Sequence, residues 1–176
     1  MTREEYNGVV YDLDGTLVRL AVDWASARRS VAGVYREAGV DPDGMDLWDM
    51  LEAARDHGLY DAVESSIADH ERAGASEAER LPSAGELSEL RVPAAVCSLN
   101  SEAACRIALA RHALDGYVDA VVGRDTLDVW KPDPRPLLTA IARIDRGPGS
   151  VVFVGDSERD AETARRAEVA FEYVGQ

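Results

Sequence analysis

The sequence predicts an α/β protein: a doubly wound parallel sheet with a small, all-helical insertion. From residue 81 onward, short apolar runs that are typical of buried strands alternate with helical segments of about 10 to 15 residues. Residues 18–80, in contrast, show helical periodicity and no strand signal. A length of 176 residues allows one core and a small subdomain but hardly two full domains. We therefore expect one domain that contains an insertion.

The first predicted strand, Val9-Val10-Tyr11, ends in an unusual polar segment. Asp12 and Asp14 follow it with one residue between them, and Gly15 and Thr16 come next. Residues two apart on a strand point to the same side, so the two carboxylates are expected to share a face. At about 4 Å they repel by roughly 4 kcal/mol at an effective dielectric near 20. Such a pair needs a cation, a shared proton or open water.

The insertion is expected to consist of helices joined by turns. An apolar stripe with spacings of three and four follows Asp23, a plausible N-cap, and Gly39 ends it. Residues 73–76 are small and polar, so we expect a flexible connection there. The predicted helices cover residues 23–39, 46–57 and 59–72.

The rest of the chain is predicted to alternate between helices and strands. The helix that starts with Asp133 as N-cap and Pro134 in its first turn has the clearest start signal. The strands are expected over residues 94–98, 117–122 and 151–154, with a last short strand through Tyr173. The helices are expected over residues 83–90, 101–112 and 133–144, with a last helix that ends near Ala167. In such parallel sheets, ligands bind beyond the carboxyl ends of the strands.

Polar residues gather at those strand ends. The residues in question are Asp12 and Asp14 after the first strand, Ser98 after the second, Lys131 after the third, and the segment Gly155-Asp156-Ser157-Glu158-Arg159-Asp160 after the fourth. Lys131 is the only lysine in the chain. A cluster of carboxylates beside one lysine suits Mg²⁺, which prefers oxygen ligands and shares them with phosphate.

These residues resemble the four dispersed motifs of the haloacid dehalogenase-like phosphohydrolases, in the same order along the chain. The matching segments are Asp12-Leu13-Asp14-Gly15-Thr16-Leu17, Ser98, Lys131-Pro132 and Gly155-Asp156-Ser157 with Asp160. The resemblance implies a Rossmann-like core made of residues 1–17 and 81–176. The insertion occupies the position of that family's cap, so residues 18–80 are expected to form a small helical cap.

The resemblance also implies a two-step phosphoryl transfer. Asp12 would attack phosphorus and form an aspartyl phosphate, which divides one difficult displacement into two easier ones. Asp14 would protonate the leaving oxygen and then accept a proton from the attacking water.

Metal and substrate ligands follow from the same resemblance. Mg²⁺ would be held by the Asp12 carboxylate, the Asp14 backbone carbonyl and Asp156, with Asp160 behind them. Ser98 and Lys131 would bind phosphoryl oxygens. Thr16 and Arg19 are further substrate-binding candidates. Arg28 and Arg29 in the cap are also candidates for pairing with a second anionic group.

Several of these residues also have a purely structural interpretation. The alternatives are a turn at Asp14-Gly15, an ordinary strand-end hydroxyl at Ser98, a solvated lysine at Lys131 and a helix capping box formed by Ser157 with Asp160. Asn100 follows Ser98 by two positions, whereas family members often have Asn directly after the hydroxyl residue, so its role stays open. His57, His70 and His112 are assigned to structure or surface.

The net charge of −14 argues against nucleic acid or an anionic membrane as a partner, because phosphate binding relies on clustered Lys and Arg. Of the 19 basic residues, 18 are arginines. A GC-rich genome explains the arginines alone, whereas a halophilic origin also explains the acidity, because molar salt screens self-repulsion. We favour the halophile.

The N-terminus is charged and shows no signal peptide, and no apolar run is long enough to span a membrane, so a cytoplasmic location is expected. Cys97 and Cys105 are expected to be reduced, packed thiols. The sequence carries no signal for an oligomeric state.

The leading hypothesis is a Mg²⁺-dependent phosphatase that acts on a small phosphorylated metabolite. A carboxylated substrate such as phosphoglycolate fits the resemblance. A phosphomutase would share these residues, and a catalytically idle binding or regulatory protein would share the fold.

Overall fold

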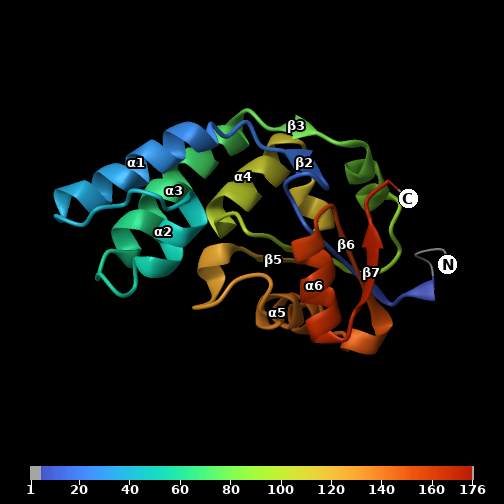
Figure 1. The fold of residues 1–176 in the computed structure, drawn as a ribbon. Coiled ribbons are helices and arrows are strands. Elements are labelled where there is room, and N and C mark those ends of the chain that lie inside the picture. Colours follow the sequence, from blue (N-terminus) through green and yellow to red (C-terminus); the bar gives the residue numbers. More distant parts are fainter. Residues whose placement is uncertain (1–4, 176) are drawn as a thin grey trace.

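A five-stranded parallel sheet lies at the centre of the computed structural model, which describes residues 5–175 (Figure 1). Across the sheet the strands are β5 (Ala120–Val122), β4 (Ala94–Cys97), β1 (Gly8–Tyr11), β6 (Val151–Gly155) and β7 (Ala170–Tyr173). Every neighbouring pair is parallel. The first strand is therefore central: the chain builds the sheet on one side of β1 and later on the other. The predicted doubly wound α/β fold is confirmed.

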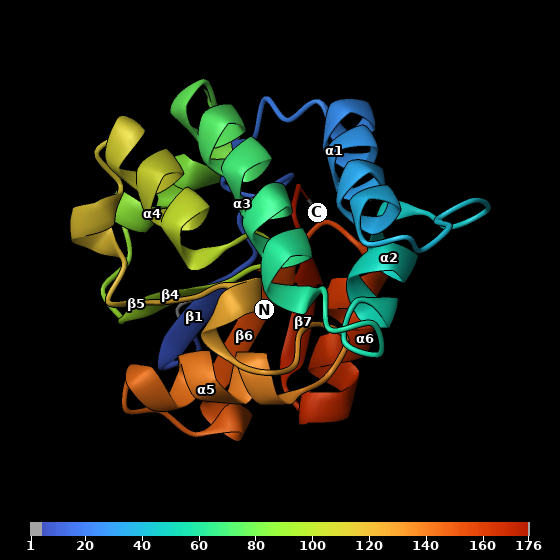
Figure 2. The same cartoon turned by 90° about the vertical axis from the view of Figure 1, so that its left-hand side faces the viewer.

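Helices cover both faces of this sheet. The described α-helices are α1 (Trp24–Glu37), α2 (Leu47–Ala53), α3 (Tyr60–Ser76), α4 (Glu102–Arg111), α5 (Arg135–Arg143) and α6 (Glu158–Ala167). Short 3₁₀ turns occupy Pro82–Ser88, Asp115–Tyr117, Arg124–Thr126 and Pro148–Ser150. Figure 2 shows α4 on one side of the sheet and α5 on the other.

Strand β1 is buried on both faces, which explains why its sequence is continuously apolar. Val9 and Tyr11 pack into the cluster that includes α4, whereas Val10 packs into the cluster that includes α5 and α6. This alternation follows from the two-residue period of a strand. It also fixes the direction of the chain at the end of β1, where the polar segment begins.

Helices α1, α2 and α3 form a separate helical layer at one end of the molecule (Figure 1). The layer has its own apolar core, which includes Val31, Tyr35, Met50 and Ile67. Asp23 caps α1 by accepting a hydrogen bond from the Ser26 amide, as predicted for this N-cap. The layer thus packs as a small unit of its own.

The chain enters and leaves the helical layer through a two-stranded antiparallel sheet. Strand β2 (Val18–Arg19) pairs with β3 (Glu79–Arg80). Sequence patterns do not reveal this pair, because two residues are too few to show a two-residue period. The expectation of an insertion without strands is therefore wrong at its two ends.

The flexible connection predicted at residues 73–76 is also wrong, because these residues form the last turn of α3. Gly74 packs against the segment that leads into α1: a Cβ at this position would lie 2.6 Å from a methyl group of Val22. The absence of a side chain at Gly74 therefore permits close packing rather than flexibility.

Other element boundaries differ by a few residues. The helix expected over 83–90 is a 3₁₀ turn, and the strand expected over 117–122 begins only at Ala120. Helix α5 begins one residue later than predicted, with Pro134 as N-cap, although Asp133 still accepts a hydrogen bond from the Arg135 amide at 2.9 Å.

Cys97 and Cys105 are buried free thiols, as predicted. Burial raises the pKa of the Cys97 thiol to about 12 and also raises that of Cys105. Among the described helices, none combines the length and apolarity that crossing a membrane requires.

Candidate active site

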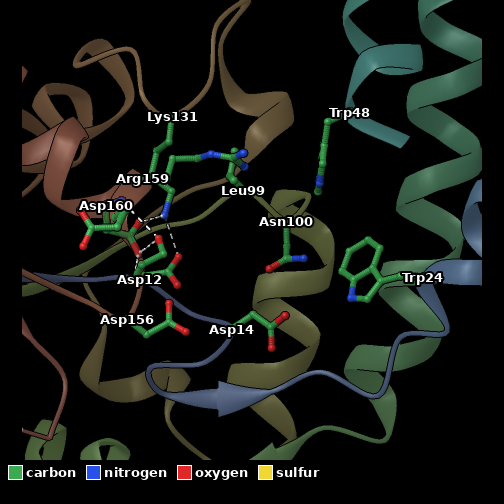
Figure 3. A pocket seen from close by; sticks show the side chains of 12 residues that line it. Asp12, Asp14, Trp24, Trp48, Leu99, Asn100, Lys131, Asp156, Arg159 and Asp160 are labelled. Atoms are coloured by element: carbon green, nitrogen blue, oxygen red, sulfur yellow. Dashed lines mark hydrogen bonds and ion pairs between the residues drawn. The ribbon is translucent and has the colours of Figure 1, made fainter. Parts of the chain in front are cut away.

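A cavity of about 390 Å³ opens at the carboxyl ends of β1, β4 and β6 (Figure 3). On the core side it is lined by Asp12, Asp14, Leu99, Asn100, Lys131 and residues 156–160. The opposite wall is formed by Trp24 and Trp48 from the helical layer. The cavity lies where a parallel sheet is expected to bind its ligand.

Asp12 lies at the centre of the core side. Its amide donates the last hydrogen bond between β1 and β6, to the Val154 carbonyl at 2.8 Å, so the strand ladder fixes its position. Its carboxylate accepts a hydrogen bond from Lys131 Nζ at 2.8 Å, and the same ammonium donates to Asp160 Oδ1 at 2.5 Å. All three side chains are almost fully buried. Two buried carboxylates therefore share one ammonium group.

Burial raises the pKa of Asp12 to about 7, although the positive charge of Lys131 opposes this shift. Burial alone lowers the pKa of Lys131, but attraction to Asp12 and Asp160 outweighs it, so the pKa rises. The lysine is thus held in its charged form. When both carboxylates are ionised, they exceed the lysine by one negative charge.

Asp156 adds to this excess of negative charge. One oxygen from each of Asp12, Asp156 and Asp160 lies within 4.8 Å of the others. Burial and the nearby Asp160 raise the pKa of Asp156. In an octahedral site with ligands at about 2.1 Å, opposite ligands lie about 4.2 Å apart. The three carboxylates therefore suit a divalent cation that prefers oxygen ligands.

Two glycines allow the carboxylates to come this close. Gly15 has φ +84°, and a Cβ there would overlap the Asp156 carboxylate. At Gly155 a Cβ would lie 2.7 Å from the Asp160 side chain. Neither position has room for a larger residue.

Asp14 lines the same cavity beside Asp12. Its Oδ1 accepts a hydrogen bond from the Leu20 amide at 2.8 Å. Burial raises the pKa of Asp14, and the Leu20 hydrogen bond partly opposes the shift. A carboxyl group with a raised pKa holds a proton more readily than an exposed one, which suits a general acid.

Asp160 forms the helix cap that the sequence offered as one alternative, and it also contacts Lys131. With Ser157 it forms the capping box of α6, in which the Ser157 hydroxyl donates to Asp160 Oδ2 at 2.6 Å. Its other oxygen pairs with Lys131. The helix cap therefore also fixes the position of the lysine.

Ser98 follows β4 and is itself buried; the cavity is lined by the next two residues, Leu99 and Asn100, and not by Ser98. Its hydroxyl donates to Asn100 Oδ1 and accepts from the Asn100 amide, both at 3.1 Å. Asn100 in turn donates to Glu71 Oε1 of α3 at 3.2 Å. Asn100 therefore links Ser98 to the helical layer.

Thr16 and Arg19, which were predicted to bind substrate, do not line this cavity. Both lie at a second cavity, of about 370 Å³. The chain turns at Gly15 and continues into β2, which carries these side chains away from Asp12. Thr16 is fully buried, and its hydroxyl has no hydrogen-bond partner among residues 5–175. Arg19 is exposed and lies 3.7 Å from a carboxylate oxygen of Glu79.

The arginines predicted on the first cap helix also point elsewhere. Arg28 donates to the Met45 carbonyl at 2.6 Å, and Arg29 lies 4.0 Å from an oxygen of Asp23. Both side chains are engaged within the helical layer.

A buried ion-pair network that the sequence did not reveal joins the helical layer to the core. Arg124, which follows β5, donates to Glu64 at 2.8 and 2.9 Å and to Glu71 at 2.5 and 3.0 Å. Arg124 and Glu71 are fully buried. Glu71 also accepts from the Asn100 side chain and from the Ser101 amide. In the sequence these charges look like any solvated helix face, so nothing marked them as buried.

No sequence pattern assigned Trp24 or Trp48 to the site, and Arg159 was expected there only as part of the segment that follows the fourth strand. Trp24 fits the apolar stripe of α1, and only the packing of the layer turns it to the cavity, where its ring centroid lies 6.1 Å from that of Trp48. In Figure 3 both rings face the carboxylate cluster from the other side, and the Arg159 side chain extends between the two sides.

Comparisons with known proteins give one consistent result. A family model for haloacid dehalogenase-like hydrolases matches residues 9–174. A phosphoglycolate phosphatase from Cereibacter sphaeroides is 32% identical in an alignment 190 positions long, which covers 93% of this chain and 83% of that protein.

Solved structures with the same fold are also found. A HAD-superfamily hydrolase of subfamily IA from Geobacter sulfurreducens has a TM-score of 0.64 at 24% identity and covers 94% of this chain and 88% of its own. CbbY from Rhodobacter sphaeroides, in complex with phosphate, has a TM-score of 0.67 at 16% identity. The match covers 97% of this chain and 87% of the CbbY chain. At these identities the likeness concerns the fold.

Proposed function

The chain belongs to the haloacid dehalogenase-like hydrolase family, and we propose that it is a Mg²⁺-dependent phosphatase that hydrolyses a small phosphorylated metabolite. The similarity to a phosphoglycolate phosphatase supports a substrate resembling phosphoglycolate. The observation that carries the proposal is the convergence of Asp12, Lys131, Asp156 and Asp160 in one cavity. These residues come from three separate segments of the chain.

We propose that Asp12 is the nucleophile. Its carboxylate is fixed by the strand ladder and by Lys131, so it can attack phosphorus without first being reoriented. An aspartyl phosphate would form as the bond between phosphorus and the leaving oxygen breaks. Asp14, whose raised pKa suits proton transfer, would protonate that oxygen and later accept a proton from the hydrolytic water.

The remaining residues would hold the cation and the phosphoryl oxygens. Asp12, Asp156 and the Asp14 backbone carbonyl would bind Mg²⁺, and Asp160 would support them through Lys131. A bound Mg²⁺ would reduce the repulsion between the carboxylates and the incoming phosphate dianion. Lys131 would bind a phosphoryl oxygen, and Ser98 another after a rotation of its hydroxyl away from Asn100.

We also propose that residues 18–80 act as the cap. The helical layer forms one wall of the cavity, and it joins the core through the short β2–β3 pair and the Arg124 network. A wall built this way would exclude water and contact the leaving group.

The direct test is hydrolysis of p-nitrophenyl phosphate with and without Mg²⁺. We expect metal-dependent turnover that falls by about a thousandfold or more in Asp12→Asn, because the nucleophile is removed. Mass spectrometry of acid-quenched wild-type enzyme should find a phosphorylated peptide containing Asp12. A matched thermal melt would confirm that the variant is folded. Undiminished turnover in Asp12→Asn would contradict the proposal.

A further inference from the structure

Arg159 is the one of the two cations in the cavity lining whose charge has no partner within residues 5–175. Lys131, the other cation in the lining, is paired with Asp12 and Asp160. The Arg159 guanidinium forms no hydrogen bond or ion pair within residues 5–175, where most other arginines form at least one. The neighbouring Glu158, a possible partner, instead accepts a hydrogen bond from the Tyr173 hydroxyl at 2.7 Å.

The position of Arg159 is also unfavourable for stability. It lies in the first turn of α6, between Glu158 and Asp160. The positive end of the helix dipole lies there, so a cation costs about 0.3–1 kcal/mol at such a position. An unpaired arginine at this place does not stabilise the helix. Its side chain is instead available to a ligand in the cavity that it lines.

Two further hydrogen-bond donors without partners face the same space. The indole N–H groups of Trp24 and Trp48 form no hydrogen bond within the described part of the chain. In Figure 3 both rings lie on the side opposite Asp12, Asp156 and Asp160, and the nitrogen of Trp24 points toward the side of Asp14. This half of the cavity thus offers donors and a positive charge, whereas the half near Asp12 offers mainly carboxylates.

We infer that Arg159, together with the indole N–H groups of Trp24 and Trp48, binds a carboxylate on the leaving group of the phosphorylated substrate. The inference rests on the proposed function, because it assigns the part of the cavity that the phosphoryl group would leave free. A guanidinium fork matches a carboxylate in two parallel hydrogen bonds. One cation balances one carboxylate, whereas a second phosphate would bring about two negative charges into a cavity that is already acidic.

The inference is tested with two substrates that differ in this carboxylate, 2-phosphoglycolate and ethyl phosphate. In Arg159→Gln we expect kcat/KM for 2-phosphoglycolate to fall by about 10- to 100-fold, mainly through KM, because a charge-assisted contact is lost. The change for ethyl phosphate should stay within about threefold. Arg159→Lys should restore part of the preference, because it keeps the charge without the fork.

Matched variants separate this contact from general effects. Arg165→Gln removes the same charge from the same helix, but Arg165 pairs with Glu162 on the exposed surface. The value of kcat/KM should therefore stay unchanged for both substrates. Trp48→Phe keeps an aromatic ring but removes the indole N–H, and it should lower kcat/KM for 2-phosphoglycolate by about 3- to 10-fold. An equal loss for both substrates in Arg159→Gln, or no loss, would overturn the inference and leave the phosphatase proposal intact.

A binding measurement keeps the inference testable if neither substrate is turned over. In the Asp12→Asn background, calorimetry should show that 2-phosphoglycolate binds more tightly than ethyl phosphate. Adding Arg159→Gln should abolish that difference. Equal binding of both compounds to Asp12→Asn would overturn the inference, whatever the catalytic result.

Discussion

Lys131 shows how one residue type meets a local requirement. Its ammonium group lies between Asp12 and Asp160, at 2.8 and 2.5 Å, and the side chain is 3% exposed. A compact ammonium with three donors fits between two carboxylates, whereas a planar guanidinium needs more room. A chain that otherwise uses arginine has its single lysine here. The pairing with two carboxylates excludes the alternative of a solvated surface lysine.

Gly15 provides a residue-scale prediction with an internal control. Gly15→Ala places a Cβ against the Asp156 carboxylate, whereas Gly44, with φ +83°, has open space around it. Both substitutions carry the left-handed backbone cost of about 1–2 kcal/mol. We expect Gly15→Ala to lower phosphatase activity by about tenfold or more, because the new Cβ would displace the Asp156 carboxylate and small displacements in an active site slow the reaction strongly.

Two quantities are measured for each variant: kcat/KM with p-nitrophenyl phosphate, and the free energy of unfolding in urea. Gly44→Ala should lose stability with little change in activity. Equal activities in the two variants would show that the position of Asp156 does not depend on Gly15.

At the scale of elements, the helical layer is joined to the core by charge as well as by chain connection. Arg124 follows β5, whereas Glu64 and Glu71 lie on α3. A buried ion pair is not strongly stabilising by itself, but removal of one partner leaves the others uncompensated. The network therefore favours one fixed arrangement of layer and core.

We expect Arg124→Met to destabilise the protein by about 3–5 kcal/mol, because it leaves two carboxylates without their cation. Urea unfolding gives this value. Arg106→Met is the control: Arg106 forms an exposed pair with Glu102 four residues away, and its loss should cost about 0.5 kcal/mol or less.

A second variant separates a lost charge from a lost side chain. Arg124→Met combined with Glu64→Gln and Glu71→Gln should recover part of the stability, because the uncompensated charges are removed. If Arg124→Met costs no more than Arg106→Met, the network does not hold the layer in place.

Element boundaries show where local patterns were insufficient. The apolar stripe of α1 and its Asp23 cap are local signals, and the structure has both. The end of α3 was missed because Ala73-Gly74-Ala75-Ser76 has the composition of a linker. Only the close approach of Ala21 and Val22 explains why small residues are used in that turn.

At the scale of the whole molecule, the acidic composition predicts a response to salt. The net charge is −14, so self-repulsion opposes the folded state at low ionic strength. The Debye length falls from about 10 Å at 0.1 M salt to about 3 Å at 1 M. If the protein comes from a halophile, its melting temperature should rise by about 5 °C or more between 0.1 and 2 M KCl.

Sucrose at matched osmolality is the control, because solute exclusion stabilises folded proteins without screening charge. The salt response should exceed the sucrose response. A melting temperature that stays constant or falls in KCl would remove the halophile hypothesis and leave a GC-rich genome as the explanation for the arginines.

Local features of the sequence were enough to predict the strands of the main sheet in their chain order and the residues that end them. Asp12, Asp14, Lys131, Asp156 and Asp160 were recognisable because strand ends and motif spacing are local properties of the chain. The rule that parallel strands direct their carboxyl ends to one edge was enough to place these residues together.

Which side chains face these site residues depends on the tertiary structure and was not predictable from the sequence. Thr16 and Arg19 are close to Asp14 in sequence but lie at another cavity, whereas Trp24 and Trp48 reach the site from a separate layer. Arg124 is buried only because α3 packs over it. Contacts between distant segments depend on how whole elements pack, and no local period of 2 or 3.6 residues encodes that packing.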